Sequence, residues 1–139
     1  MEIRPVSADF AVSPQMQPKD LAALADEGFT AVICTRPDGE EPGQPALSAM
    51  RAAAQDAGLA FHHIPVKGGV FPPAAVAAFA DARRAAHGKV LGYCRSGMRA
   101  ITLDALANVE GVSAQERIAA AAKAGFDLSA LADRMEASV

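Results

Sequence analysis

The sequence predicts an α/β fold with a mostly parallel sheet of four to five strands and helices on both faces. Short apolar runs alternate along the chain with alanine-rich stretches of helical periodicity. Glycine or proline separates most of these segments and marks where they begin and end. Because parallel neighbours are joined by crossovers, which are usually helices, this alternation favours three layers. We expect ligands to bind at the carboxyl ends of the strands.

The first half of the chain is predicted to contain three strands and two helices. A strand is expected around residues 10–12. Pro18 stands where a helix would begin and Gly28 where it would end, and Leu21 and Leu24 lie on one face between them. The same signals then predict a strand at residues 30–35, a loop at 36–44, a helix at 45–57 ended by Gly58, and a strand at 60–66 in which Pro65 ends the pairing.

The second half is predicted to be helical except for one strand. A loop at residues 67–72 leads into a helix through Phe79 that stops at Gly88, and a strand at 89–93 follows. The remaining segments have helical spacing. Ser113 and Glu116 form the pattern of a capping box, and Asp127 stands as a cap before the last apolar stretch, with Leu128, Leu131 and Met135.

Composition limits the functions that the chain can have. Its 139 residues, about half of them apolar, suit a single domain, residues 1–139, with its own core. The net charge of −3 gives no basic surface for nucleic acid. The N-terminus lacks the apolar region of a secretory signal, and no stretch reaches the ~18 apolar residues of a membrane span. We expect a cytoplasmic protein that binds neither membrane nor nucleic acid.

The segment from Cys94 to Arg99 is the strongest candidate for a functional site. It follows the predicted strand 89–93 and directly precedes an apolar helical pattern. A cysteine in such a loop faces unpaired N–H groups and the positive end of a helix dipole, which favour the reactive thiolate. Arg95 and Arg99 add positive charge. We expect Cys94 to be a nucleophile; the alternative is a small buried residue. Gly97 is expected to supply a positive φ or space for a ligand.

Three predicted loops should line one pocket, because they all leave carboxyl ends of strands. They begin at Arg36, Lys67 and Cys94. Lys67 would add positive charge to this pocket, or would be a solvated lysine in a flexible loop. Asp38 is a candidate acid from the neighbouring loop; the alternative is a turn residue that caps its own backbone and pairs with Arg36.

Histidine and the second cysteine give weaker signals. His62 and His63 are neighbours on a strand, so their side chains point to opposite faces and cannot share a metal. One of them could donate to an anion, although a hydrogen-bonded structural role is the simpler interpretation. Two cysteines are too few for a structural zinc site. We expect neither a metal nor a cofactor, and we expect Cys34 to be a core residue, with redox pairing to Cys94 as the alternative.

Four segments carry a resemblance to a known family. They are residues 36–40 (Arg-Pro-Asp-Gly-Glu), 64–66 (Ile-Pro-Val), 93–99 (Tyr-Cys-Arg-Ser-Gly-Met-Arg) and 124–128 (Ala-Gly-Phe-Asp-Leu). With the order of elements, they resemble the dual-specificity and tyrosine phosphatase fold and, more closely, the bacterial phosphatase-like domain of beta-lactamase hydrolase-like proteins (DUF442). This family is described both as phosphatase-like and as sulfurtransferases, alone or fused to proteins of sulfide and persulfide metabolism. The resemblance therefore implies a phosphotyrosine-phosphatase-like three-layer fold.

Two departures from the phosphatase pattern favour sulfur transfer. Four residues separate Cys94 from Arg99, whereas the phosphatase signature has one more residue between its cysteine and its arginine. The shorter loop would form a narrower cradle for phosphate. The string Cys-Arg-Ser-Gly-x-Arg is similar instead to the active loop of rhodanese domains. Phosphatases also place a general acid where this chain has Lys67, Gly68 and Gly69. Sulfur transfer does not need that acid, because sulfite or a thiolate leaves readily as an anion.

The sequence thus predicts a sulfurtransferase in which Cys94 takes a sulfur atom from thiosulfate or a small persulfide and passes it to a thiol or cyanide. Arg99 is expected to hold the anionic end of the donor. Backbone N–H groups from Arg95 to Arg99, including those of Ser96, Gly97 and Met98, are expected to cradle it. Proteins of sulfide and persulfide oxidation are possible partners. The alternatives are a phosphatase of low activity and a non-catalytic module that carries a persulfide or senses redox state.

Overall fold

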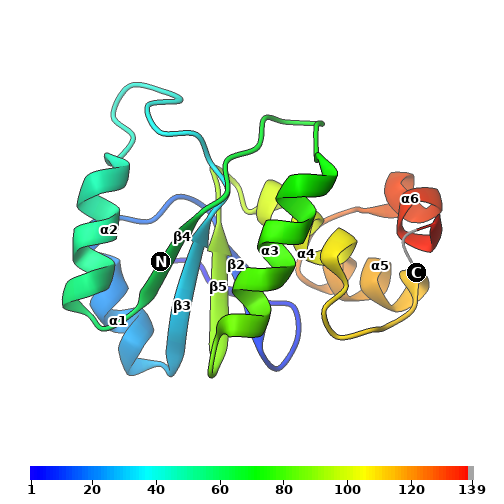
Figure 1. Ribbon diagram of the computed structural model, residues 1–139, viewed down its shortest axis with the longest axis horizontal. Helices are drawn as coiled ribbons and strands as arrows, with labels where there is room; N and C mark the ends of the chain where they lie inside the picture. Colours follow the sequence, from blue (N-terminus) through cyan, green and yellow to red (C-terminus); the bar gives the residue numbers. More distant parts are fainter. Residues whose placement is uncertain (138–139) are drawn as a thin grey trace.

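Strand β5 (Lys89–Tyr93) lies at the centre of a five-stranded sheet. The structure is a computed structural model, which describes residues 1–137. The strand order is β1-β2-β5-β3-β4 (Figure 1). β2, β5, β3 and β4 run parallel, whereas β1 pairs antiparallel with β2 at one edge. The expectation of a mostly parallel sheet is confirmed. The other strands are β1 (Arg4–Pro5), β2 (Phe10–Ser13), β3 (Phe29–Cys34) and β4 (Ala60–His63).

Helices cover both faces of this sheet. Figure 1 shows α1 (Leu21–Asp26) and α2 (Leu47–Asp56) on one side and the remaining helices on the other. A short 3₁₀ turn (Pro18–Asp20) precedes α1, and Gly28 ends it with a φ of 92°. The helices on the second side are α3 (Pro73–Ala85), α4 (Met98–Ala107), α5 (Ala114–Lys123) and α6 (Ala132–Ala137), the last preceded by a 3₁₀ turn (Ser129–Leu131).

Two apolar clusters fill the spaces between the three layers. Successive residues of a strand point to opposite faces, so β2 gives Ala11 to one cluster and Val12 to the other. The cluster under α1 and α2 contains Leu24 and Met50, both fully buried. Phe79 of α3 anchors the opposite cluster and packs edge to face on Phe10, with ring centroids 5.8 Å apart.

Gly92 of β5 lets α4 approach the sheet closely. A Cβ atom at this position would lie 3.0 Å from the Cβ of Ala100 and 3.1 Å from the ring of Phe10. Both distances are shorter than side chains normally allow, so a larger residue would push α4 away from β5. The loop of residues 94–97 connects β5 to α4, so the close packing of α4 on β5 fixes the position of that loop.

Most expected element boundaries agree with the structure within a few residues. The strand expected at 60–66 ends at His63, but its ladder continues, because the N–H groups of Ile64 and Val66 donate to the carbonyls of Cys34 and Thr35. Ser113 accepts a hydrogen bond from the N–H of Glu116, as the capping box predicts. The short edge strand β1 has no counterpart among the predicted elements.

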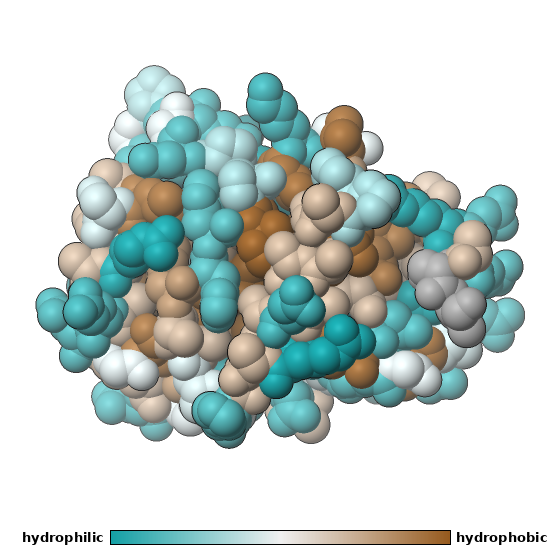
Figure 2. Space-filling view, in the orientation of Figure 1, coloured by the Kyte–Doolittle hydropathy of each residue, from teal (hydrophilic) through white to brown (hydrophobic). Residues whose placement is uncertain are grey.

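The surface is a mixture of hydrophilic and hydrophobic residues, with hydrophobic areas over α3 in the view of Figure 2. Large hydrophobic side chains exposed among the described residues are Met1, Val70 and Met98. Within residues 1–137, none of the helices has both the length and the apolar character needed to cross a membrane.

Candidate active site

The loop between β5 and α4 holds Cys94 at the start of a helix, as the sequence predicts. Gly97 is the residue before α4 and has a φ of 101°, a left-handed conformation that side chains rarely adopt. Its N–H donates to the Cys94 sulfur, with 3.1 Å between nitrogen and sulfur. This donor and the positive end of the α4 dipole both stabilise negative charge on the sulfur. Cys94 itself is only 1% exposed, so its neighbours cover it almost completely.

Neighbouring backbone contacts hold the rest of the loop in place. The carbonyl of Arg95 accepts a hydrogen bond from the N–H of Gln15, which follows β2. The hydroxyl of Ser96 accepts one from the N–H of Met98 and so covers a free donor at the start of α4. The side chains of Arg95, Ser96 and Met98 are all exposed.

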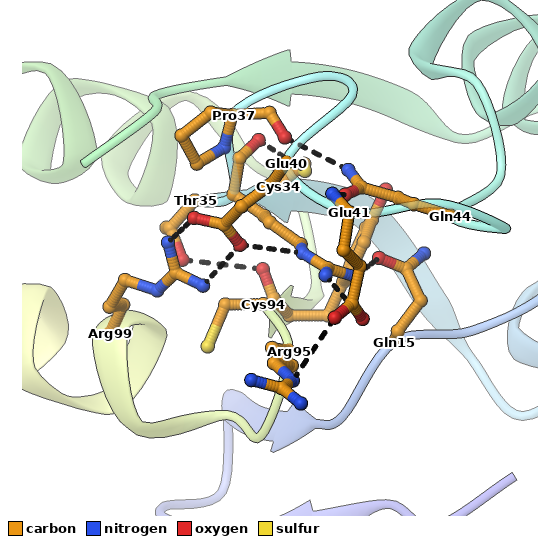
Figure 3. A network of polar contacts seen from close by, with 12 residues as sticks. Gln15, Cys34, Thr35, Pro37, Glu40, Glu41, Gln44, Cys94, Arg95 and Arg99 are labelled. Carbon is orange, nitrogen blue, oxygen red and sulfur yellow. Dashed lines mark hydrogen bonds and ion pairs between the residues drawn. The ribbon is translucent and has the colours of Figure 1, made fainter. Parts of the chain in front are cut away.

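Arg99 lies in the first turn of α4 and is bound by an acidic residue of a distant loop. Its two terminal nitrogens, Nη1 and Nη2, each donate to a different oxygen of Glu40 at 2.8 Å. Nη1 also donates to the carbonyl of Val66 at 3.0 Å. Hydrogen bonds to Glu40, followed by the nearby Cys94 sulfur, raise the pKa of Arg99. Figure 3 shows Glu40 facing the Arg99 guanidinium beside Cys94.

Behind Glu40 lies a second arginine, Arg36, whose side chain is 1% exposed. Its Nε donates to Oε1 of Glu40 at 2.8 Å, and Nη2 lies 2.7 Å from Oε1 of Glu41. Nη1 donates to the side-chain carbonyl of Gln15 at 3.0 Å. Glu41 also reaches the exposed Arg95, at 3.6 Å. Arg36 therefore ties the two glutamates to the segment after β2, and Glu41 connects them to the Cys94 loop.

Both glutamates are held in the ionised form by these arginines. Hydrogen bonds from Arg99, and then from Arg36, lower the pKa of Glu40 to about 2 despite its partial burial. A hydrogen bond from Arg36 is the main cause that lowers the pKa of Glu41. Near neutral pH neither carboxyl group carries a proton to donate.

Three loops at the carboxyl edge of the sheet meet at a small cavity of about 270 Å³, as the sequence predicts. Its lining residues are Arg36, Glu40, Glu41, Gly68, Arg95 and Arg99. Lys67 is exposed and does not line the cavity, although its neighbour Gly68 does. The expected contribution of Lys67 to anion binding has no contact to support it.

Asp38 lies apart from this cavity. Its side-chain oxygen accepts a hydrogen bond at 3.0 Å from the N–H of Leu47, the first residue of α2. It therefore caps the beginning of a helix, rather than its own turn, and it does not pair with Arg36, whose partners are Glu40 and Glu41. An aspartate in this position satisfies a free N–H group and complements the helix dipole.

The other candidate residues have structural surroundings. His63 shares a hydrogen bond with the carbonyl of Arg36, 2.8 Å away, and burial lowers the pKa of His62. Cys34 and Tyr93 are buried in the core, and burial is the main cause that raises the pKa of both. Both cysteines are free thiols. Residues 1–137 contain no cluster of histidine, cysteine and acidic side chains that could hold a metal.

Sequence reasoning assigns no role to three residues of this site: Gln15, Glu40 and Glu41. The composition of the segment from Arg36 to Glu41 indicates a loop in which Asp38 is the acid to consider. The one signal in the sequence is that two adjacent glutamates, Glu40 and Glu41, follow Arg36 in the same loop. No local sequence pattern connects Glu40 with Arg99, which is 59 residues further along the chain. Only the tertiary structure brings these side chains together.

The sequence matches the family model of the phosphatase-like domain of beta-lactamase hydrolase-like protein over residues 2–111. A beta-lactamase hydrolase-like protein of Xylella fastidiosa (strain Temecula1) is 39% identical over 130 residues, or 92% of this chain. One of Agrobacterium fabrum is 37% identical over 98 residues, or 70% of this chain. The matched regions are 30% and 23% of these relatives, so the chain corresponds to less than a third of their length.

Solved structures with the same fold include several phosphatase-like proteins. A structure described as a "putative phosphatase" from Neisseria meningitidis is 31% identical with a TM-score of 0.85, covering 100% of this chain and 99% of that one. PTPMT1 has a TM-score of 0.77 at 17% identity, covering 99% of this chain and 93% of that one. Active-form Tk-PTP has 0.71 at 18% identity, covering 99% and 97%. The latter two show the fold alone, and they confirm the expected phosphatase-like three-layer architecture.

Proposed function

The chain belongs to the family of the phosphatase-like domain of beta-lactamase hydrolase-like proteins, and we propose that within it the chain is a cysteine-dependent sulfurtransferase with Cys94 as nucleophile. The sulfur is carried as a persulfide on Cys94 between a small sulfur donor and a thiol acceptor. Gly97 and the start of α4 stabilise the charge on the attacking and departing sulfur.

The reaction has two steps in which charge and atoms balance. In the first, the Cys94 thiolate attacks the outer sulfur of the donor and forms a new S–S bond. The donor's own bond to that sulfur breaks, and its electron pair leaves with a thiolate or with sulfite. In the second step an acceptor thiolate, or cyanide in an assay, attacks the outer sulfur of the Cys94 persulfide. The acceptor keeps the sulfur, and Cys94 returns as a thiolate.

One observation carries this proposal: the two acids that line the cavity are paired with arginines. Glu40 bonds both Arg99 and Arg36, and its pKa is about 2. A protein phosphatase needs a protonated acid for the leaving alkoxide, a step worth ~10²–10⁴ in rate. The third acid of that loop, Asp38, caps α2 instead. Sulfite and thiolates leave without a proton, so sulfur transfer suits the ionised site.

Phosphate ester hydrolysis is the second candidate, because the similar Neisseria meningitidis structure is described as a "putative phosphatase". An aryl phosphate is the substrate class that this site would accept, since a phenolate is a better leaving group than an alkoxide and depends less on a general acid. In that reaction Cys94 would attack phosphorus, and water would then release phosphate from the cysteine.

A turnover assay with two substrates separates the two candidates. The protein is given a small persulfide or thiosulfate with cyanide as acceptor, and thiocyanate is measured; hydrolysis of p-nitrophenyl phosphate is measured in parallel. We expect thiocyanate to form with at least one donor and to disappear in Cys94→Ser. Hydrolysis of the phosphate ester alone, dependent on Cys94, would replace sulfur transfer with the phosphatase function. A reactive Cys94 without turnover of any substrate would leave a non-catalytic persulfide carrier or redox module.

A further inference from the structure

Glu40 occupies one of the two faces of the Arg99 guanidinium that can bind a substrate anion. Arginine grips carboxylates, phosphates and sulfonates through its two Nη atoms or through Nε and one Nη, and Glu40 takes the first pair at 2.8 Å. The third acceptor of Arg99 is the carbonyl of Val66. An incoming oxyanion must therefore displace Glu40 or bind beside its negative charge.

Displacement of Glu40 is opposed by Arg36. This buried guanidinium donates to Glu40 through Nε, and its side chain is only 1% exposed. If Glu40 moved away, a buried positive charge would lose one of its two carboxylate partners, which is strongly unfavourable. The contact of Arg36 with Gln15 anchors the same arrangement to the segment after β2. Glu40 is therefore part of the resting site.

The two glutamates offset most of the positive charge of the cavity before any substrate enters. The cavity is lined by three arginines, Arg36, Arg95 and Arg99, and by two glutamates, which leaves a net charge of +1. A dianion gains less from such a site than from the same arginines without the glutamates. In addition, two of the three large hydrophobic side chains exposed among the described residues are Val70, in the loop between β4 and α3, and Met98, the first residue of α4.

We propose that Glu40 determines substrate specificity, because its carboxylate fills the Nη face of Arg99 and thereby selects sulfur donors that carry at most one negative charge over dianions. The donor class is a hydropersulfide, R–S–SH, and dianions such as thiosulfate and phosphate monoesters are disfavoured. This inference rests on the proposed sulfurtransferase function. In the reaction with R–S–SH, the Cys94 thiolate bonds to the terminal sulfur, the R–S bond to that sulfur breaks, and R–S⁻ leaves.

The test compares Glu40→Gln with Glu27→Gln, which removes the same charge from an exposed residue at the opposite end of β3. The first readout is the kcat/KM for thiosulfate divided by that for a persulfide with an uncharged R group. We expect Glu40→Gln to raise this ratio by about five- to tenfold, the effect of one partly exposed charge a few ångströms away. Glu27→Gln should stay within about twofold of wild type by the same reasoning, since distant exposed charges are screened. An unchanged or lower ratio in Glu40→Gln would overturn the proposal.

A second readout does not depend on sulfur transfer. Cys94 is alkylated with anionic iodoacetate and with neutral iodoacetamide, and the ratio of the two rates is compared between the same variants. We expect Glu40→Gln to raise the iodoacetate to iodoacetamide ratio by about fivefold. If no donor places sulfur on Cys94 but this ratio rises, the proposed function fails while the exclusion of anions by Glu40 stands. If persulfide forms and neither ratio changes, the role of Glu40 fails alone.

Glu41→Gln covers the case in which Glu40→Gln does not fold. The Glu41 side chain is 40% exposed, against 30% for Glu40, and its ion pair with Arg95 is longer, at 3.6 Å. We expect both ratios to rise by about threefold, which is more than the spread allowed for Glu27→Gln and less than in Glu40→Gln, because the Glu41 charge is better screened. Ratios that stay within the spread of Glu27→Gln, or that fall, would contradict the effect of negative charge at this site.

Discussion

Replacing Gly97 by alanine should damage both the fold and the reactivity of Cys94. Gly97 has a φ of 101°, and an alanine held at this φ is strained by about 1–2 kcal/mol. The new Cβ would also lie 3.1 Å from the ring of Phe126 and 3.4 Å from the carbonyl oxygen of Ser13. The first contact is tight, so the partly buried Phe126 ring must shift by a few tenths of an ångström, whereas the second is an ordinary van der Waals distance; crowding therefore adds about 1–2 kcal/mol. We expect Gly97→Ala to lower the free energy of unfolding by about 2–4 kcal/mol.

Gly111→Ala is the matched control for this prediction. Gly111 also has a positive φ, 67°, but no atom lies within 4 Å of the place that a Cβ atom would occupy there. Urea unfolding should show a loss of only about 1 kcal/mol for Gly111→Ala, from backbone strain alone. In Gly97→Ala, we expect the strained φ to relax and to move the N–H group away from the Cys94 sulfur. Alkylation of Cys94 by iodoacetamide should then slow by about five- to tenfold, since part of a charge-assisted hydrogen bond is lost. Equal stability and equal alkylation rates in the two variants would show that neither the positive φ nor the contacts of Gly97 matter to the Cys94 loop.

Three further predictions concern the loop that begins at Arg36. Asp38→Ala should lower the free energy of unfolding by about 0.5–2 kcal/mol, because the N–H of Leu47 loses its cap. The rate of Cys94 persulfide formation should change less than about twofold. A tenfold or larger decrease in this rate would show that Asp38 takes part in the reaction. Arg36→Met should lower the free energy of unfolding by about 1–3 kcal/mol, because Glu40 and Glu41 both lose a partner, although Glu40 keeps Arg99 and its side chain is 30% exposed; stability equal to that of wild type would contradict the anchoring role. Because arginines lower the pKa of Glu40 from 4.5 to about 2, the stability from this pairing is present above the ordinary pKa and is lost as the pH falls through that range. We therefore expect the free energy of unfolding to fall less between about pH 5 and about pH 3 in Glu40→Gln than in wild type. An equal decrease in the two proteins would contradict the pairing of Glu40 with the arginines.

Local patterns are sufficient to predict the part of the site that local geometry determines. An apolar strand, a short loop with glycine and a following helical pattern place Cys94 at the start of α4, and Gly97 has the positive φ expected of it. The rule that parallel strands gather ligands at their carboxyl ends predicts that the Arg36, Lys67 and Cys94 loops line one cavity. These inferences need only the order of elements and the direction of strands.

The arginine and glutamate network could not be predicted, because it depends on the path of an irregular loop. Glu40 meets Arg99 only because the loop after β3 folds over the start of α4, and no periodic pattern describes that path. For the same reason the sequence suggests Asp38 as an acid, although its side chain turns to α2. The two residues of β1 are too few for an alternating pattern, so no sequence signal marks that strand.

Mass spectrometry of the intact protein after treatment with a small persulfide, with thiosulfate in a parallel sample, tests whether Cys94 carries a sulfur atom as a persulfide. We expect one added sulfur atom per chain in the wild type with the persulfide, a smaller labelled fraction with thiosulfate, and no addition in Cys94→Ala. A wild-type protein that stays at its original mass with both donors, while p-nitrophenyl phosphate adds a phosphoryl group to Cys94, would contradict this expectation.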